Sequence, residues 1–116
     1  MDLNKITLIG KCTNAIDYSK HEWYDMLKFT LVTNFAYKNH DGWRVQESEY
    51  HTCIAYDDAA NFLYEHIARW SKLYLEWRLK TSQWTTAQAE KKYSTHVIVS
   101  HYIVLDKVDH TQNIDW

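Results

Sequence analysis

Five stretches of the chain alternate apolar and polar residues, which is the period of β-strands that cover a core with one face. The clearest stretch is 72–80, where leucine and tryptophan at odd positions alternate with charged residues and tyrosine at even positions. In 26–37, Leu27, Phe29 and Leu31 form the apolar row, which we expect to face the core. The pattern predicts strands over 3–12, 26–37, 46–56, 72–80 and 93–105.

The segments between these strands indicate how they are connected. A polar connection is predicted over 14–25, a turn at 38–42 where Asp41-Gly42 favours positive φ, and a polar hairpin loop over 85–92. Asp57-Asp58 opens an amphipathic helix that is expected to reach Ala68. Five strands with one helix between the third and the fourth is the order of the OB-fold, a partly open Greek-key barrel. The predicted fold class is therefore all-β, a five-stranded OB-fold barrel with one helix.

Length and composition limit the chain to one domain. With 116 residues, 46% of them hydrophobic, the chain has room for a single core, which we assign to 1–106, with 107–116 as a short C-terminal tail. No stretch approaches the roughly 18 apolar residues of a membrane span, and the start lacks the features of a secretion signal. We expect a soluble cytoplasmic protein that does not interact with a membrane.

Candidate chemistry is sparse. Cys12 and Cys53 lack a C-x-x-C spacing and are expected to be small buried thiols, and the seven histidines are too scattered for a metal site. Nothing places a carboxylate such as Glu47, Glu49 or Glu76 beside a base or a metal, and no nucleophile motif occurs. The sequence therefore predicts a protein that is not an enzyme and needs no cofactor.

The motifs in the strands resemble the bacterial-type single-stranded DNA-binding protein family. The matching segments are 3–10 (LNKITLIG), 29–34 (FTLVTN), 49–51 (EYH), 79–84 (LKTSQW) and 92–97 (KYSTHV), which follow in the family's order. The similarity extends over 2–106. It implies an OB-fold that assembles as a homo-oligomer, a dimer or tetramer, and binds unpaired DNA without sequence preference in replication, recombination and repair.

The resemblance also implies which residues contact DNA. The family's base-stacking rings fall on Tyr37, Tyr50, Tyr56 and Trp84, and Tyr50 and Tyr56 share strand parity. Strand propensity alone would assign these rings to barrel packing or an oligomer contact. Arg78 and Lys80 are the strongest phosphate candidates, because they alternate on the polar side of their strand near Trp84. Further candidates are Lys28, Lys38 and Arg44, and also Lys91 and Lys92 in the predicted hairpin loop.

Two features point to a second reading. The net charge of −2 and the pI near 6.4 are unusual for a nucleic-acid binder. Asp57, Trp70 and Trp77 stand where the family usually has glycine, and the chain has two glycines and no proline, which indicates an engineered or diversified sequence. The alternative function is an OB-fold oligomerisation or protein-interaction scaffold whose DNA binding is weakened or lost.

The resemblance implies one subunit contact and one partner site. His51 would lie at an oligomer interface, although a lone histidine satisfied by a neighbouring group explains it equally well. The family ends in a flexible linker and an acidic tip that recruits other proteins, of which 113–116 (NIDW) is a faint echo. This remnant argues against protein recruitment through the tail.

Overall fold

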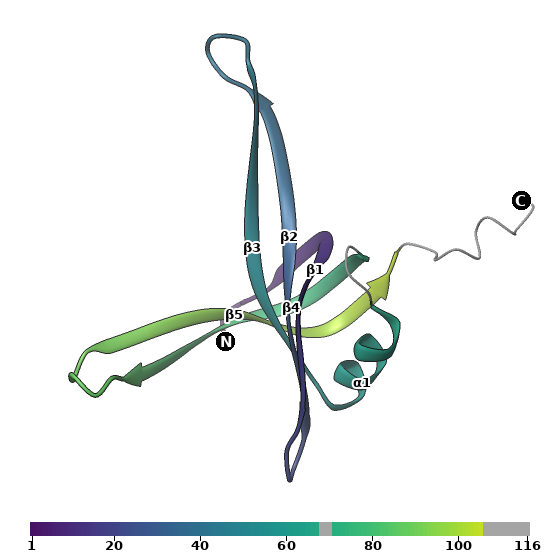
Figure 1. Cartoon of the computed structure of the whole chain (residues 1–116), viewed down its shortest axis with the longest axis vertical. Helices are drawn as coiled ribbons and strands as arrows, with labels where there is room; N and C mark the ends of the chain where they lie inside the picture. The colour runs from purple at the N-terminus through teal and green to yellow at the C-terminus, as the bar shows by residue number, and fades with distance from the viewer. Residues whose placement is uncertain (68–70, 106–116) are drawn as a thin grey trace, which may run out of the picture.

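The structure is a computed structural model that describes residues 1–67 and 71–105. Five strands close into a barrel in the order β1-β2-β3-β5-β4 (Figure 1). Neighbouring strands are antiparallel except β3 and β5, which are parallel. The one helix of the described residues lies between the third and fourth strands, so the predicted OB-fold order is confirmed. The elements are β1 (Ile6–Lys20), β2 (Asp25–Lys38), β3 (Arg44–Tyr56), α1 (Asp57–His66), β4 (Lys72–Thr85) and β5 (Lys91–Val104).

Strand β1 closes the barrel by pairing with two neighbours. Its first half is antiparallel to β4 and its second half to β2, and Lys11 pairs with both. Gly10 makes this change of partner possible, because a Cβ there would lie 2.3 Å from the carbonyl oxygen of Val32. The predicted polar connection over 14–25 is wrong for most of its length, since β1 continues to Lys20. Its backbone is hydrogen-bonded to β2, so the polar side chains do not prevent a strand.

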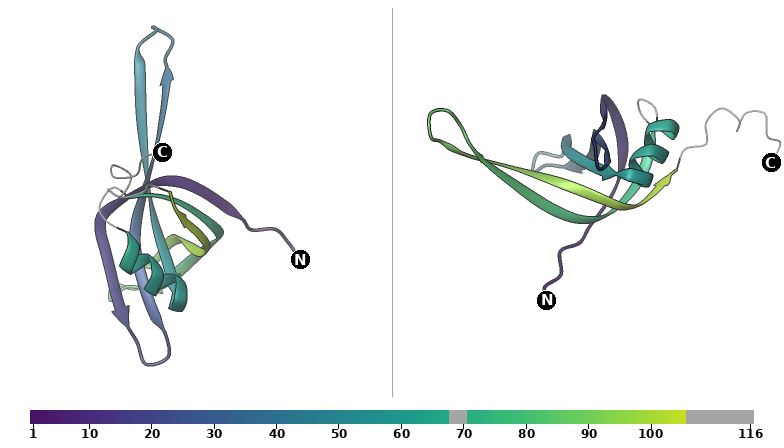
Figure 2. Two further views of the ribbon diagram at one scale, coloured as in Figure 1. Left: turned by 90° about the vertical axis from the view of Figure 1, so that its right-hand side faces the viewer. Right: turned by 90° about the horizontal axis from the view of Figure 1, so that it is seen from below.

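The core occupies the inner face of the barrel. Leu27, Phe29 and Leu31 are buried there, as their alternation predicted. Helix α1 lies at the end of the barrel away from the tip of the β2–β3 hairpin (Figure 2), and it buries Ala60 and Leu63. The other members of the core cluster are Cys12, Cys53, Ala55, Leu73, Leu75, Val97 and Val99.

Two long hairpins project from the barrel in different directions (Figure 1). We call residues 33–49 the β2–β3 arm and residues 79–96 the β4–β5 arm. The predicted turn at the first tip is confirmed: Gly42 has φ +83°, and the Asn39 Oδ1 atom accepts hydrogen bonds from the backbone N–H groups of Asp41 and Trp43. At the second tip the hairpin loop is shorter than predicted, because β4 extends to Thr85 and β5 begins at Lys91.

The three positions that depart from the family's glycines have different outcomes. Asp57 has φ +51°, the conformation that favours glycine, and its Oδ1 atom accepts a hydrogen bond from the backbone N–H of Asp25 at 3.1 Å. Trp77 keeps the core-side parity of β4 and pairs with Val99, but it is 45% exposed and so does not fill the interior. Trp70 and the predicted tail over 107–116 lie outside the described residues.

Candidate nucleic-acid interface

The strand register aligns four residues in one row across four strands. Lys28 of β2 pairs with Ile54 of β3, and Ile54 pairs with Ile98 of β5. Ile98 in turn pairs with Arg78 of β4. Because paired residues project to the same side of a sheet, these four side chains share one face, which we call the outer face. It is the face opposite to the core residues Phe29, Cys53 and Val97.

Three of the predicted stacking rings lie on the outer face. Tyr50 pairs with Val32, Tyr56 with Met26 and Trp84 with Lys92, all at positions with the parity of the aligned row. Their exposed fractions are 69%, 40% and 49%, so none of the rings is consumed by core packing. The shared parity of Tyr50 and Tyr56 is therefore confirmed, and the structure offers three accessible aromatic rings with the parity of the outer face.

Predicted phosphate contacts share this face. Arg78 and Lys80 alternate with inward positions along β4, as predicted, and Lys92 lies opposite Trp84. At the end of the β2–β3 arm, Lys38 pairs with Arg44. The outer face thus carries Lys28, Lys38, Arg44, Arg78, Lys80 and Lys92.

Tyr37 departs from this arrangement. It pairs with Val45, five positions along β2 from Val32, and therefore points to the opposite side of the β2–β3 arm from Tyr50. Phe35 lies on the same side, with a centroid distance of 5.8 Å between the two rings. Tyr37 therefore does not share a face of the arm with Tyr50, and its contact with DNA stays a prediction.

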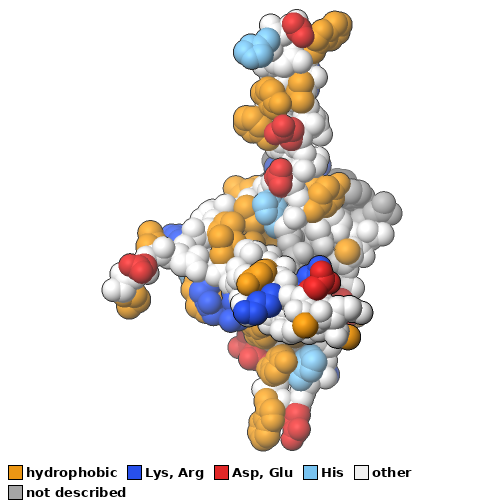
Figure 3. Space-filling model, turned by 90° about the vertical axis from the view of Figure 1, so that its left-hand side faces the viewer, with side chains coloured by type: hydrophobic (Ala, Val, Ile, Leu, Met, Phe, Trp, Pro, Cys, Tyr) orange, Lys and Arg blue, Asp and Glu red, His pale blue; other side chains and the backbone are white. Residues whose placement is uncertain are grey.

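Two of the three acidic side chains of the arm lie on this opposite side. Glu47 pairs with Phe35 and Glu49 with Thr33, so both carboxylates have the parity of Tyr37. In the view of Figure 3, Lys and Arg side chains group on the body of the molecule with acidic side chains beside them, and further acidic side chains lie along the upright arm. On the β2–β3 arm, Glu47 and Glu49 thus lie on the face opposite to Lys38 and Arg44, a separation that the net charge of the chain does not reveal.

The two lysines predicted for the hairpin loop lie on a strand. Lys91 and Lys92 are the first residues of β5, which corrects their placement in the loop. Lys92 has the parity of the outer face, whereas Lys91 pairs with Thr85 on the other side of the arm. Only Lys92 of this pair joins Trp84.

Two contacts restrain the basic and aromatic side chains. The Arg78 guanidinium lies over the Trp77 ring, 4.7 Å from its centroid, so the tryptophan at a family glycine position holds a predicted phosphate ligand. The Tyr56 ring meets Tyr24 edge to face at 5.8 Å, and Tyr24 stacks on His21 at 4.6 Å. These contacts leave both groups on the surface with less rotamer freedom to lose on binding.

His96 is a residue of this face that sequence reasoning missed. It pairs with Lys80, and its Nδ1 atom is buried without a hydrogen-bond partner among the described residues. The only signal in the sequence was its position two residues before Ile98, which places it on the same side of β5.

His51 satisfies part of its polar demand locally. Its Nε2 atom lies 2.9 Å from the hydroxyl oxygen of Thr33, at a half-buried position on the inner side of β3. This contact matches the local explanation of the histidine, while its place at a subunit interface stays a prediction.

The other candidate groups, Glu76 and the two cysteines, are either paired or buried. Glu76 forms an ion pair with Lys5 at 3.1 Å, and the hydrogen bond from Lys5 lowers the pKa of the Glu76 carboxyl, opposite to the shift a general acid needs. Cys12 and Cys53 are fully buried free thiols, and burial raises their pKa to about 11 and about 12.

Within the described ranges, no three His, Cys, Asp or Glu side chains group as metal ligands, and no helix has the length and apolar character to cross a membrane.

The closed barrel with accessible rings and cations on one outer face defines an OB-fold of the kind that accommodates unpaired nucleic acid. The model of the Single-strand binding protein family matches residues 3–105, and the chain belongs to this family.

Individual relatives agree with this assignment. The chain is similar to single-stranded DNA-binding protein 1 of Streptococcus pyogenes serotype M18, with 26% identity over 96% of this chain and 85% of the relative. It is 28% identical to single-stranded DNA-binding protein 1 of Chlorobaculum tepidum over 92% of this chain and 67% of the relative.

Solved structures share the fold at low sequence identity. The Plasmodium falciparum SSB in complex with ssDNA superposes with a TM-score of 0.83 at 24% identity, covering 91% of this chain and 97% of that one. The small single-stranded DNA-binding protein from Streptomyces coelicolor gives a TM-score of 0.71 at 13% identity, covering 90% and 95%.

Proposed function

We propose that this protein binds single-stranded DNA without a sequence requirement and keeps it from re-pairing during replication, recombination or repair in the cytoplasm. The observation that supports the proposal best is the outer face, where Tyr50, Tyr56 and Trp84 accompany six cationic side chains. Flat rings stack on any base, and cations neutralise phosphates whatever the sequence. Membership of the Single-strand binding protein family points to the same ligand.

The proposed mechanism is equilibrium capture without a chemical step. Phosphates of the strand replace counterions around Lys80, Arg78 and Lys92, and neighbouring bases stack on the exposed rings. The strand runs across the aligned row from the β2–β3 side to the β4–β5 side. Because each bound segment has its bases engaged, it is withdrawn from the pool of strands that can anneal.

A fluorescence titration tests the proposal. Oligo-dT is added at low and at high salt while tryptophan emission is followed, because Trp84 lies on the outer face. Capture predicts strong quenching with an affinity that falls steeply as salt rises. Absence of quenching and of a mobility shift at low salt would instead favour the scaffold function, in which the barrel is kept and the DNA surface is lost.

We also propose that the protein acts as a homodimer or homotetramer. Ile9 of β1 and Ile103 of β5 flank Tyr74 in one row on the barrel surface, and the two isoleucines are 53% and 55% exposed. Exposed apolar side chains in one row are typical of a surface that a second subunit covers. Light scattering measures the mass directly, and Ile9→Lys with Ile103→Lys is expected to shift the protein towards a monomer.

A further inference from the structure

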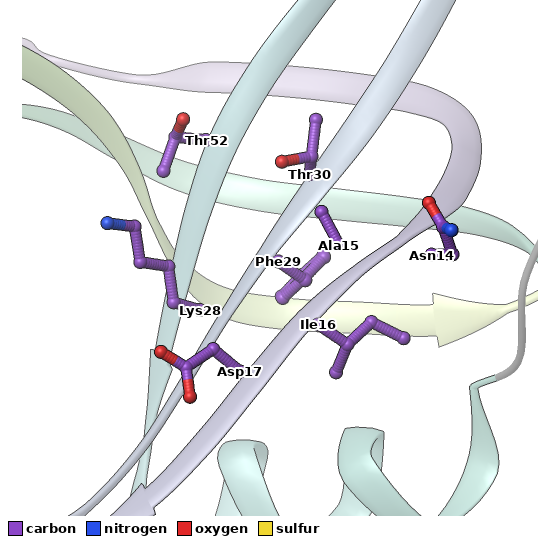
Figure 4. Close-up of a pocket in the computed structure, with 8 residues that line it drawn as sticks. All are labelled: Asn14, Ala15, Ile16, Asp17, Lys28, Phe29, Thr30 and Thr52. Atoms are coloured by element: carbon purple, nitrogen blue, oxygen red, sulfur yellow. The ribbon is translucent and has the colours of Figure 1, made fainter.

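A recess opens between β1 and the outer face of β2 and β3. It has a volume of about 330 Å³, near the lower end of the roughly 300–1,000 Å³ typical of ligand pockets. The recess arises where the β1–β2 register shifts between Cys12 and Ile16, so that β1 leaves β2 locally. Figure 4 shows its lining: Asn14, Ala15, Ile16 and Asp17 from β1, Lys28, Phe29 and Thr30 from β2, and Thr52 from β3.

The polar side chains of this lining have no partners within the described part of the chain. The side chains of Asn14, Asp17, Lys28, Thr30 and Thr52 make no hydrogen bond or ion pair there. Asp17 and Lys28 are cross-strand neighbours, yet their charged groups lie beyond ion-pair distance. Two hydroxyls, an amide, a carboxylate and an ammonium group are therefore free to bind a ligand in one recess.

The recess is continuous with the proposed DNA surface. Lys28 belongs to the aligned row, and Thr30 pairs with Thr52 one step further along the same face. Tyr50, the most exposed of the three rings on that face, is two residues from Thr52 on β3. A strand that stacks on Tyr50 thus passes the mouth of the recess.

We propose that the recess binds a single base turned out of the bound strand, and that it prefers cytosine to thymine. This inference rests on the proposed function. The Asp17 carboxylate accepts a hydrogen bond from the exocyclic amine of cytosine, but it faces a carbonyl oxygen when thymine is present. Asn14, at the other end of the recess in Figure 4, donates its amide N–H to the ring carbonyl, and Lys28 binds the adjoining phosphate.

The energetic balance favours this arrangement in unpaired DNA. Turning a base out of a strand costs least when it has no pairing partner. Ile16 and Ala15 provide apolar contact for the ring, while the unpartnered polar groups gain hydrogen bonds to the base in place of bonds to water. The protein would then bind every sequence, with a modest bias superimposed.

The experiment compares oligo-dC with oligo-dT of equal length, at mildly alkaline pH so that cytosine stays neutral. The native chain is expected to bind oligo-dC about fivefold more tightly, the discrimination of one good base contact. In Asp17→Asn the side-chain amide can both donate and accept hydrogen bonds, so the ratio of oligo-dC to oligo-dT affinity is expected to fall close to one. Glu65→Gln removes the same charge from helix α1 and should leave the ratio unchanged.

A second variant blocks the recess while keeping the carboxylate. Ala15→Leu fills the space beside Ile16, so it should also abolish the cytosine preference and leave oligo-dT affinity as it was. A dC-to-dT ratio of one in the native chain, or a ratio that survives Asp17→Asn or Ala15→Leu, would overturn the inference. If the native chain binds neither oligo-dC nor oligo-dT, the proposed function itself is refuted.

Discussion

The Tyr37 hydroxyl donates a hydrogen bond to Oε2 of Glu47 at 3.3 Å, on the side of the β2–β3 arm opposite to Tyr50. The negative charge of Glu47 raises the pKa of Tyr37, with smaller contributions from burial and from the hydrogen bond itself. The ring therefore stands in a negative local field, which repels the phosphates of an approaching strand.

This relationship predicts unequal roles for the two tyrosines. Tyr50→Ala is expected to weaken oligo-dT binding by about 1–3 kcal/mol, the loss of one stacked base. Tyr37→Ala should cost less than half as much, because its ring lies beside Glu47 and away from the outer face. Isothermal titration of both variants decides the matter, and equal losses would show that DNA also contacts the acidic side of the arm.

Trp84 offers a spectroscopic test of the outer face. Trp84→Ala is expected to weaken binding by about 1–3 kcal/mol and to remove much of the ligand-induced quenching. The matched control is Trp23→Ala, which removes a tryptophan that is 85% exposed in the turn between β1 and β2. If the control loses as much affinity as Trp84→Ala, the assignment of Trp84 to the site is wrong.

Adjacent lysines provide a direct test of the charge arrangement. Lys92→Gln should reduce the slope of log affinity against log salt by about 0.7, the value for one phosphate contact to a single strand. Lys91→Gln, one residue earlier, projects to the other side of the β4–β5 arm and should leave the slope nearly unchanged. The slopes are measured from titrations at four salt concentrations. A larger change of slope for Lys91→Gln than for Lys92→Gln would contradict the assignment of the two lysines to opposite faces.

Asp57 combines an unfavourable backbone conformation with a favourable hydrogen bond. Its positive φ costs about 1–2 kcal/mol, while its carboxylate accepts from the backbone N–H of Asp25. Asp57→Ala keeps the strain and loses the bond, so the free energy of unfolding should fall by about 1 kcal/mol or more. Asp57→Gly relieves the strain as it loses the bond and should be close to neutral. Denaturant unfolding of both variants measures the difference, and a more stable Ala variant would refute this account.

The two glycines should respond differently to alanine. Gly10→Ala places a Cβ against the carbonyl oxygen of Val32, which a backbone atom cannot avoid cheaply, and we expect a loss of about 3 kcal/mol or more. Gly42→Ala meets open space and carries only the cost of positive φ, about 1 kcal/mol. Thermal unfolding of the two variants ranks them. Equal losses would mean that β1 can shift at its change of partner.

The sequence predicted the strands in which apolar and polar side chains alternate along the chain. The alternation of Leu27, Phe29 and Leu31 predicted β2, and Asp41-Gly42 predicted the turn because glycine adopts a positive φ at little steric cost. The second half of β1 was missed, because its polar side chains carry no strand signal and its pairing with β2 decides its conformation.

The sequence names candidate residues for the site but does not arrange them in space. Parity within one strand placed Tyr50 and Tyr56 together, but relating Tyr37 to them required the register between β2 and β3. The same holds for Lys91 and Lys92, whose sides became defined only when β5 was seen to begin at Lys91. The recess at Asp17 depends on a register irregularity that no local pattern encodes.

The parallel contact between β3 and β5 is short, because only Cys53 with Val97 and Ile54 with Ile98 pair there. Local opening of the barrel should therefore begin between β3 and β5, since fewer backbone hydrogen bonds must break there than between any other neighbouring strands. A polynucleotide that crosses from β3 to β5 at this point would hold the two strands together. Hydrogen exchange at these four amides should consequently slow more on loading with DNA than exchange elsewhere in the sheet.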